Sequence, residues 1–588
     1  MMTALSRYSA GQRARCFLAP PPFRASMPAL ATPARPDVLP DAAERAFVRD
    51  TIVQERVGGQ FWAKALPRSF TAVLCVPSAL PLAQARAALH PLAARHPRQN
   101  ILLLPSRFDR QSKRLARRLG LACADAHVLD PHAVLDTVRD LCALTPDGPQ
   151  HDLCLLAALR GLTVSITSGP AGTAQPLTEQ AALDHILNDT RYSCPFTGQP
   201  TTCRAVLDVL VLWKQTLQAN RQVGACMGMS LWKRPQIAAF LASAPGHPAF
   251  FRSIPRAVAA CRATRRPGVA IWTTRMPAGV EQHLAQAGLT LLRVEDGFIR
   301  SIGLGSALQP PASIFLDRRG VYYDPAQPSD LEHILATTVF DDTLRARAQT
   351  LMVRLRDAGI SKYGKGEPEQ PRQRAARSGP VILVPGQVAD DLSVLRGGGQ
   401  IRDNLALLRA VRAARPDAYI LYRPHPDVEA GYRKGALPDA VVLETADEIS
   451  RGGAITSVLM QVDAVHTLTS LAGFEALVRG IPVTTYGTPF YAGWGLTTDQ
   501  APVPARRGRA LTLAELVAGT LLLYPRYLDP VTHLPCPVEI LLDRFDQPDA
   551  WRQTRWMALR RTQMALRQSL PSRLFTKARH FIRTCTVP

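Results

Sequence analysis

The stretch His466-Thr-Leu-Thr-Ser-Leu-Ala-Gly-Phe-Glu475, followed by Ala476-Leu-Val-Arg-Gly-Ile-Pro-Val-Thr-Thr-Tyr-Gly487, decides the fold class. It predicts a strand end, a turn of small residues with hydroxyls, a helix and a second strand, as in an open α/β sheet. Ligands of such sheets bind beyond the carboxyl ends of the strands, where a helix N-terminus attracts anions. Thr469 and Ser470 therefore lie where a phosphate would be held, although Ser and Thr also cap helices that bind nothing.

Two further predicted strands deliver polar side chains to the same edge. The apolar run that starts at Val381 leads through a Pro-Gly turn to Asp391, and the run that starts at Ala418 leads to His425. A proline on each side of His425 restricts the backbone, so the imidazole is held in one orientation. A single His is more often structural than catalytic, and its rigid mount at a strand end is what makes this one a candidate.

Length and composition indicate a globular protein of several domains. A chain of 588 residues suggests about three or four domains, and 46% hydrophobic with 20% charged residues is ordinary for a soluble protein. The formal charge of +23 favours a polyanionic partner or an anionic membrane. The basic runs lack aromatic interleaving and zinc-finger spacing, so we expect no nucleic-acid partner. The 11 cysteines form no Cys-x-x-Cys pair, which predicts reduced thiols and no metal site.

The two ends of the chain differ from the rest. The first residues are rich in Pro, Ala and Arg, and their one apolar patch is too short and proline-broken for a signal peptide, so we predict a disordered leader over 1–59. No apolar run reaches the roughly 18 residues that a membrane-spanning helix needs. From Trp551 to Arg583 the tail interleaves nine Lys or Arg with apolar residues. It is either a basic amphipathic helix on anionic lipid or a helix packed on the protein's own surface.

Residues 60–221 resemble a degenerate copy of the stretch around Thr469. The matching pairs are 99–108 with 418–427 and 155–165 with 474–484 at one offset of 319 positions, and 191–200 with 526–535 at an offset of 335. Ser106 stands where the later copy has His425, and Leu156 where it has Glu475. Loss of polar residues at strand ends, with apolar residues retained, indicates a lost ligand site on a retained core. We therefore expect a non-catalytic remnant that serves as an interaction platform.

The middle of the chain predicts another α/β unit. Residues 268–275 and 289–294 have the pattern of parallel strands separated by a helix at 280–286. The loop after the second strand, Glu295-Asp-Gly-Phe-Ile-Arg300-Ser-Ile-Gly-Leu-Gly-Ser306, offers Arg300 and backbone amides to an anion. It lacks the Gly-x-Gly-x-x-Gly spacing of a dinucleotide site. A hairpin at 313–324, helical sequence over 331–360 and a linker at 365–379 complete this unit.

Eight motifs together resemble the KpsC-type capsule polysaccharide β-Kdo transferases, over about residues 223–545. They are Glu295-Asp-Gly-Phe-Ile-Arg, Gly320-Val-Tyr-Tyr-Asp, Ser361-Lys-Tyr, Val384-Pro-Gly-Gln-Val-x-Asp-Asp, Pro424-His-Pro-Asp, Thr469-Ser-Leu-x-Gly-Phe-Glu-Ala-Leu, Phe490-Tyr-Ala-Gly-Trp-Gly-Leu and Tyr527-x-x-Pro-x-Thr. The chain departs from that family at Gly364, where Asn is usual, at Arg423, where Lys is common, and in its eroded first module. The last departure argues against synthesis of two alternating linkages.

The resemblance implies an α/β fold with a GT-B-like pair of Rossmann-type lobes after the degenerate α/β remnant. The expected segments are a leader 1–59, the remnant 60–221, an N-terminal lobe 222–370, a CMP-binding C-terminal lobe 371–545 and a basic amphipathic tail 546–588. The implied reaction is transfer of Kdo from CMP-β-Kdo, with retention of configuration, onto a lipid-linked glycan in capsule biosynthesis. We expect the reaction to need no cofactor and no metal. CMP-Kdo is the donor substrate.

Retention requires either two inversions or a front-face route, and double displacement needs a carboxylate nucleophile and a separate acid/base. The resulting catalytic assignments are Asp391 as nucleophile, Glu295 as acid/base and His425 as a donor to the phosphate. CMP binding is assigned to His425, Thr469, Ser470, Gly473 and Glu475, and substrate binding to Arg300, Lys362 and Gln387. A helix cap or a solvated loop carboxylate is the alternative for each acid.

Two other functions remain open from the sequence. One is transfer of another CMP-ulosonic or CMP-sialic acid, because the nucleotide site would look the same. The other is a non-catalytic scaffold for capsule assembly, with other capsule-assembly proteins as partners. For either enzyme we expect a cytoplasmic protein, peripheral on the inner face of the bacterial inner membrane, whose partners are a CMP-sugar donor and a lipid-linked acceptor.

Overall fold

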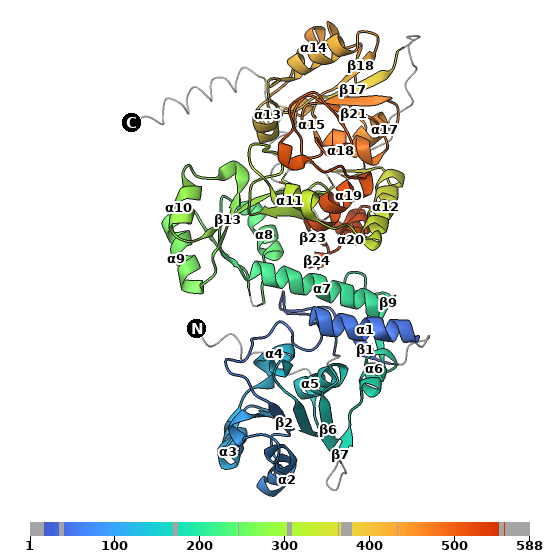
Figure 1. The fold of residues 1–588 in the computed structure, drawn as a ribbon. Helices are drawn as coiled ribbons and strands as arrows, with labels where there is room; N and C mark the ends of the chain where they lie inside the picture. The colour runs from blue at the N-terminus through green and yellow to red at the C-terminus, as the bar shows by residue number, and fades with distance from the viewer. Residues whose placement is uncertain are drawn as a thin grey trace. The chain divides into compact units, whose positions relative to one another are not determined.

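The computed structural model describes residues 17–34, 40–167, 174–244, 246–302, 308–362, 364–365, 379–431, 433–551 and 558. The chain forms two compact units (Figure 1). Unit 1 comprises Met1–Arg221 with Ala242–His247, and unit 2 comprises Gln222–Leu241 with Pro248–Pro588. The predicted loop 303–306, most of the linker 365–379 and most of the tail 546–588 lie outside the described residues.

Unit 1 is built on a six-stranded sheet of order β4-β3-β2-β5-β6-β7, parallel except for β7. Its strands are β2 (Ala72–Val76), β3 (Ile101–Pro105), β4 (Ala122–Cys123), β5 (Asp140–Leu144), β6 (Thr163–Thr167) and β7 (Ala174–Pro176). Its helices are α2 (Leu82–Ala93), α3 (Arg110–Leu119), α4 (Pro131–Leu135), α5 (Gly148–Leu159) and α6 (Glu179–Leu187). Helices α2 and α3 share one apolar core with the sheet, because their buried leucines pack on alternate residues of β2 and β3.

The predicted disordered leader is wrong for residues 40–55. They form α1 (Ala42–Glu55), which is capped by Asp41 and buries Val48 and Ile52 against unit 1. Strand β1 (Ala31–Pro33) also lies in the predicted leader. It pairs with β8 (Thr190–Ser193), which pairs in turn with β9 (Pro200–Thr201). The long helix α7 (Cys203–Asn220) then packs on α1. The sequence concealed α1 because two buried apolar residues are too few to stand out among its charged ones.

Unit 2 contains two lobes, each defined by its sheet (Figure 1). The first sheet has the order β11-β10-β12-β13-β14-β23-β24; its first four strands are parallel and the remainder antiparallel. The strands are β10 (Val223–Met227), β11 (Ala249–Phe251), β12 (Gly268–Trp272), β13 (Thr290–Asp296), β14 (Ser313–Asp317), β23 (Arg526–Leu528) and β24 (Pro535–Cys536). Helices α8 (Arg234–Phe240), α9 (Ile254–Thr264) and α10 (Val280–Gln286) accompany them.

The second sheet has the order β19-β18-β17-β20-β21-β22 and is parallel throughout. Numbered along the chain this order is 3-2-1-4-5-6, the order of a Rossmann sheet, so the predicted fold class is confirmed. The strands are β17 (Val381–Pro385), β18 (Tyr419–Arg423), β19 (Glu448–Ile449), β20 (Ala464–Thr467), β21 (Val483–Thr485) and β22 (Thr498–Asp499). The helices are α13 (Leu392–Gly397), α14 (Asn404–Ala414), α15 (Pro426–Glu429), α16 (Asp439–Leu443), α17 (Ile455–Leu459) and α18 (Leu471–Val478).

The sheets of unit 1 and of the second lobe share strand order and register. One row of paired residues in unit 1 is Leu102, Val73, Leu141 and Val164. The matching row in the second lobe is Leu421, Leu383, Val465 and Val483. The outer residues of the two rows differ by 421 − 102 = 319 and by 483 − 164 = 319 positions, which is the offset of the sequence match. The first five strands therefore have the same order and direction in both copies, whereas the sixth is antiparallel in unit 1 and parallel in the second lobe.

Two expectations for unit 2 need correction. Residues 318–324 form a loop rather than the return strand of a hairpin, because β14 pairs with β13 and β23. The Asp317 carboxylate accepts the backbone N–H of Arg319 at 3.0 Å and of Gly320 at 2.9 Å and so turns the chain. The predicted lobe boundary at residue 545 is also displaced, because β23 and β24 complete the sheet of the first lobe.

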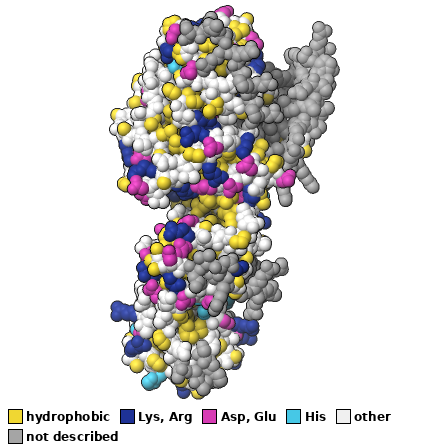
Figure 2. Space-filling view, turned by 90° about the vertical axis from the view of Figure 1, so that its right-hand side faces the viewer, with side chains coloured by type: hydrophobic (Ala, Val, Ile, Leu, Met, Phe, Trp, Pro, Cys, Tyr) yellow, Lys and Arg dark blue, Asp and Glu magenta, His cyan; other side chains and the backbone are white. Residues whose placement is uncertain are grey.

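Helices between the sheets join the lobes of unit 2. They are α11 (Asp330–Thr337), α12 (Asp342–Asp357), α19 (Leu513–Val517), a π-helix at Ala518–Leu523 and α20 (Val538–Arg544). The face of unit 2 in Figure 2 mixes cationic and anionic side chains. Ion pairs such as Arg347–Glu539 at 2.7 Å and Arg354–Asp543 at 2.6 Å connect α12 with α20. No helix in the described part of the chain is both long and apolar enough to cross a membrane.

Candidate active site between the two lobes of unit 2

Carboxylates from both lobes converge on one pair of tyrosines. Glu295 lies at the end of β13 in the first lobe, and Asp391 lies six residues after the end of β17 in the second. The pKa of Tyr322 and of Tyr323 is raised, first by burial and then by the negative charges of Glu295 and Asp391. Glu295 is paired with Phe315, whose ring centroid lies 5.2 Å from that of Tyr322. Arg396 lies on the helix that Asp391 begins, and it pairs at 2.5 Å with Asp324, next to Tyr323. The structure thus brings the two predicted catalytic acids to the same site.

Glu295 and its neighbour Asp296 have opposite electrostatic environments. Burial, followed by the charge of Asp296, raises the pKa of Glu295 to about 7. Burial alone would also raise the pKa of Asp296, but the charges of Arg300 and Lys233 outweigh it and lower that pKa. Arg300 Nε lies 2.9 Å from an Asp296 oxygen, and Lys233 Nζ lies 3.4 Å from one. One carboxylate is thus kept ionised, and the other is placed to exchange a proton near neutral pH.

Arg300 has a different place from the one predicted. Its side chain is only 1% exposed, and besides Asp296 it contacts the Ser301 hydroxyl at 2.7 Å and the Gln309 carbonyl at 2.8 Å. A guanidinium enclosed in this way presents no group to a sugar carboxylate. Its position fits a different task, which is to hold Asp296 ionised beside Glu295.

Asp391 begins helix α13 and is held by its own loop. One of its carboxylate oxygens accepts the backbone N–H of Ser393 at 2.9 Å and the Ser393 hydroxyl at 2.8 Å. The cap that we considered as an alternative role for this acid is therefore present. The side chain remains half-buried, and the adjacent Asp390 takes the ion pair with Arg433 at 2.9 Å.

His425 is a neutral hydrogen-bond donor. Its Nδ1 accepts the backbone N–H of Asp427 at 3.1 Å, which leaves the ring proton on Nε2. Burial lowers the pKa of the ring, and the charges that act on it next are those of Asp427, Lys362 and Asp391. The proline on either side fixes the loop, as expected from the sequence. His425 therefore lies near Asp391 with an N–H group to offer.

Lys362 lies at the junction of the lobes, in the turn between β15 (Ile360–Ser361) and β16 (Gly364–Lys365). Its backbone N–H donates to Glu475 Oε1 of the second lobe at 2.9 Å, and its carbonyl accepts the N–H of Arg300 of the first lobe at 3.0 Å. The positive charge of Lys362 lowers the pKa of the groups around it, which are Glu295, Asp296, His425 and Glu475. The charge of Lys362 thus acts on all four of these groups.

The predicted phosphate turn at Thr469 and Ser470 follows β20 and is hydrogen-bonded to the loop after β17. The order of the strands in the sheet reverses between β17 and β20. Gln387 Nε2 donates to the Thr469 hydroxyl at 2.9 Å, and the Thr469 N–H donates to Gln387 Oε1 at 3.0 Å. Ser470 caps α18 by accepting the N–H of Ala472 at 3.2 Å. The Gln387 amide is thus engaged with Thr469. Ser470 is the N-cap of α18, which is the alternative role that the sequence offered for it.

Gly473 and Glu475, two of the predicted CMP-binding residues, lie on α18, and their neighbours constrain both. A Cβ at Gly473 would lie 2.3 Å from the Tyr491 hydroxyl, which itself donates to the Ser470 carbonyl at 2.6 Å. Glu475 lines a small pocket with Phe298, Lys362 and Arg479, and burial raises the pKa of its carboxyl. Glycine is therefore required at 473 by Tyr491, and Glu475 faces the lobe junction.

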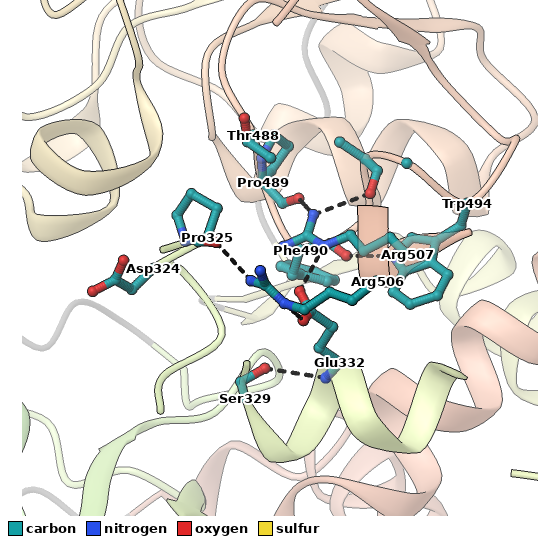
Figure 3. Close-up of polar contacts among 12 residues, drawn as sticks. Asp324, Pro325, Ser329, Glu332, Thr488, Pro489, Phe490, Trp494, Arg506 and Arg507 are labelled. Carbon is teal, nitrogen blue, oxygen red and sulfur yellow. Dashed lines mark hydrogen bonds and ion pairs between the residues drawn. The ribbon is translucent and has the colours of Figure 1, made fainter. Parts of the chain in front are cut away.

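A second polar cluster locks the lobes together (Figure 3). Glu332 on α11 is buried and forms ion pairs with Arg506 and, at 2.7 Å, with Arg507. Arg507 Nη1 also donates to the carbonyls of Pro489 at 2.6 Å and Ala492 at 3.0 Å. Next to this cluster Phe298 of the first lobe stacks on Phe490 of the second, with ring centroids 4.6 Å apart. The relative placement of the two sets of catalytic candidates depends on these contacts.

Residues 268–527 match the family model described as "Capsule polysaccharide biosynthesis protein". The chain is also 42% identical over 347 residues to the capsule polysaccharide modification protein LipA of Neisseria meningitidis serogroup A, covering 59% of this chain and 49% of that protein. These matches place residues 268–527 of the chain in the capsule polysaccharide biosynthesis family. A further relative is the lipopolysaccharide-processing protein LpsZ of Rhizobium meliloti, 38% identical over 258 residues, covering 44% of this chain and 58% of LpsZ.

This family member spans about half the length of the curated LipA relatives that it matches. Two similar solved structures come from Thermosulfurimonas dismutans. The first, "KpsC, beta Kdo 2,7 transferase", is 37% identical with a TM-score of 0.46, covering 55% of this chain and 97% of that one. The second, "KpsC, beta Kdo 2,4 transferase", is 31% identical with a TM-score of 0.48, covering 55% and 98%.

Sequence reasoning did not single out three residues of this capsule protein's site. Lys233 pairs with Asp296, and its ammonium lies 3.4 Å from the centroid of the Trp272 ring. The pKa of Tyr322 and of Tyr323 is raised, first by burial and then by carboxylates of both lobes. Lys233 follows the end of β10 by six residues, at the carboxyl edge of the first sheet, and this position could have identified it as a candidate. The tyrosines were quoted only as part of a motif, since no local pattern shows which residues face a cleft.

The matching place in unit 1 is filled by a side chain. Gln150, which corresponds to Thr469 at the offset of 319, is 1% exposed. Its Nε2 donates to the carbonyls of Val76 at 3.0 Å and Leu104 at 2.7 Å, near the carboxyl ends of β2 and β3. In this family member an amide thus occupies the edge of the unit 1 sheet where a ligand would enter.

Proposed function

We propose that this protein is a retaining glycosyltransferase that moves Kdo from CMP-β-Kdo onto a lipid-linked acceptor in capsule polysaccharide biosynthesis. The observation that carries the proposal is that Glu295 and Asp391, from different lobes, act on the same two tyrosines. A pair of carboxylates with separate environments is what double displacement requires. The proposal includes a cytoplasmic protein at the inner face of the inner membrane, where a lipid-linked acceptor would be reached.

Donor binding is assigned to the second lobe. The Nε2–H of His425 and the N-terminus of α18, which starts after Ser470, supply donors for the CMP phosphate. Glu475 is the candidate for the ribose hydroxyls. With Arg300 enclosed beside Asp296, the Kdo carboxylate is assigned to Lys362, whose charge acts on Glu295, Asp296, His425 and Glu475.

The reaction then proceeds in two displacements. An Asp391 oxygen bonds to the anomeric carbon as the bond from that carbon to the CMP phosphate oxygen breaks, and CMP leaves with the electron pair. The acceptor hydroxyl next attacks the same carbon from the opposite side, the aspartyl bond breaks and returns its electron pair to the Asp391 carboxylate, and the carboxylate of Glu295 takes the hydroxyl proton. Two inversions restore the starting configuration. The phosphate leaving group needs no acid, so one proton carrier suffices.

The test is product analysis with the purified full chain, CMP-Kdo and a synthetic Kdo-terminated acceptor. We expect a product whose new linkage has the β configuration in its NMR spectrum, and no product from Asp391→Ala, while CMP binding by that variant stays within about twofold of wild type. Product from CMP-sialic acid but not from CMP-Kdo would replace the donor. Full activity of Asp391→Ala would remove this residue as the nucleophile, and no transfer from any CMP-sugar would favour the scaffold instead.

A further inference from the structure

The outer face of α3 in unit 1 is cationic along its whole length. Ser112, Leu115, Ala116 and Leu119 form its buried face. The outward positions are Arg110, Gln111, Lys113, Arg114, Arg117 and Arg118, all exposed. Arg107 precedes the helix and is exposed as well, and the acidic residue of the segment 107–118 is Asp109, which caps the helix. We call the cations of residues 107–118 the α3 face.

The α3 face has one acid in its own segment, Asp109, and none of its cations has an ion-pair partner among the residues that the structure describes. The Asp109 carboxylate accepts the backbone N–H of Ser112 at 2.8 Å. Cations four residues apart, such as Arg110 and Arg114, repel each other and weaken a helix. This contrasts with α12 and α20 of unit 2, where cations and carboxylates alternate as ion pairs. An anionic partner would remove the repulsion.

The cationic face is specific to unit 1. At the offset of 319, residues 107–118 correspond to 426–437 of the second lobe, which follow His425. Residues 426–437 hold two cations, Arg433 and Lys434, and two acids, Asp427 and Glu429, whereas residues 107–118 hold six cations and one acid. The segment that follows the candidate CMP-binding His in one copy has thus become a charged outer surface in the other.

An exposed aromatic ring lies within this face. Phe108 is 38% exposed, and the Lys113 ammonium lies 4.4 Å from the centroid of its ring. An outward helix face is convex, so it suits contact with a broad surface better than the enclosure of a flexible chain. Cations around an aromatic ring at a convex face are typical of contact with phospholipid headgroups, where the ring enters the interface.

We propose that the α3 face binds an anionic phospholipid membrane and so holds unit 1 on it. The proposal rests on the proposed function, because a lipid-linked acceptor would lie in the same membrane. The surface potential of an anionic leaflet favours each Lys or Arg near it, so several cations on one face act together. Unit 1 would then serve as a membrane platform in place of the lost ligand site.

The test measures binding of the full chain to vesicles of phosphatidylglycerol and phosphatidylcholine, and to phosphatidylcholine alone. We expect binding only to the anionic vesicles, and a loss of about tenfold or more for the triple variant Arg110→Gln, Arg114→Gln, Arg117→Gln. The matched control is Arg252→Gln, Arg256→Gln, Arg262→Gln on unit 2, which removes the same charge from exposed positions around α9. Replacement of the three α3 arginines by Lys should keep the binding.

Several results would overturn this proposal. They are unchanged vesicle binding by the α3 Gln variant, an equal loss in the control variant, or loss of binding to RNA or an acidic polysaccharide while vesicle binding persists. Thermal unfolding of each variant shows whether it is folded. Transfer to a water-soluble acceptor should be equal in all variants, whereas transfer to an acceptor embedded in vesicles should fall in the α3 Gln variant alone. A wild type without transferase activity contradicts the proposed function and leaves the vesicle result to be judged separately.

Discussion

The backbone N–H of Lys362 donates a hydrogen bond of 2.9 Å to Oε1 of Glu475, so a carboxylate of the second lobe holds the turn between the lobes. The carbonyl of the same residue accepts the N–H of Arg300, which carries the connection on to Asp296 and Glu295. The candidate nucleotide-binding helix and the candidate acid/base are therefore mechanically linked. A change at Glu475 should be felt on both sides of the cleft.

Glu475→Ala should lower both the stability and the affinity for CMP. Loss of a buried acceptor leaves the Lys362 N–H unsatisfied, which costs about 1–3 kcal/mol. Glu475→Gln keeps an oxygen for this bond, so its thermal midpoint should stay close to wild type. Calorimetry of CMP binding then separates the two roles. Weak binding by a stable Gln variant indicates a ribose contact, and normal binding by it would remove Glu475 from the list of ligands.

Product formation should rise with pH through about 7. Glu295 must be ionised to accept the acceptor proton, and its pKa is raised to about 7 by burial and by Asp296. Asp296→Asn removes the neighbouring charge and should move this limb to lower pH. The measurement is the initial rate against pH at saturating CMP-Kdo. A limb that stays in place in the Asn variant would contradict the assignment of Glu295.

The same shift makes a separate prediction about stability. A carboxyl whose pKa is higher in the folded state binds more protons there than when unfolded. Its contribution to stability is therefore present below the ordinary value of 4.5 and is lost as the pH rises to about 7. Glu295→Gln avoids this loss, so the stability of the variant relative to wild type should increase from about pH 4 to pH 8. Denaturant unfolding at both pH values measures the difference, and the absence of an increase would indicate that Glu295 is solvated.

Glu332→Ala should destabilise unit 2 by about 3–5 kcal/mol. The substitution leaves Arg507, which is buried, without its carboxylate partner, and an uncompensated buried charge is costly. The matched control is Glu539→Ala, whose partner Arg347 is 47% exposed and whose loss should cost about 1 kcal/mol or less. Urea unfolding measures both changes. Equal effects would mean that the cluster of Figure 3 is solvated rather than enclosed.

Gly473→Ala should disrupt the start of α18 through Tyr491. The added methyl would lie 2.3 Å from the Tyr491 hydroxyl and 2.7 Å from its ring, so one of them must move. Overpacking of this kind typically costs about 1–3 kcal/mol. Tyr491→Leu alone should also destabilise the protein, but in the double variant the cost of the added methyl should largely disappear. If CMP affinity falls with Gly473→Ala and is not recovered in the double variant, Gly473 contacts the nucleotide directly.

The sequence was most informative where local patterns decide the structure. The apolar runs before Asp391 and His425 are β17 and β18, and Ser470 begins α18 as its place before a helical pattern indicated. Failures came where pairing partners are far apart in the chain. The strand Arg526–Leu528 is three residues long, and its place beside β14 depends on contacts across more than 200 positions. The enclosure of Arg300 likewise depends on Asp296 and Gln309, which no periodicity reveals.

Strands β23 and β24 return to the first sheet after the chain has completed the second. The polypeptide therefore passes between the lobes twice, once near Lys365 and once before Arg526, and the first lobe does not correspond to a single continuous segment. A chimera that exchanges donor specificity between relatives would thus need a graft bounded on both sides, from the linker to about residue 525. A single splice at the linker would also replace β23 and β24, and with them the edge of the recipient's first sheet, by the foreign strands.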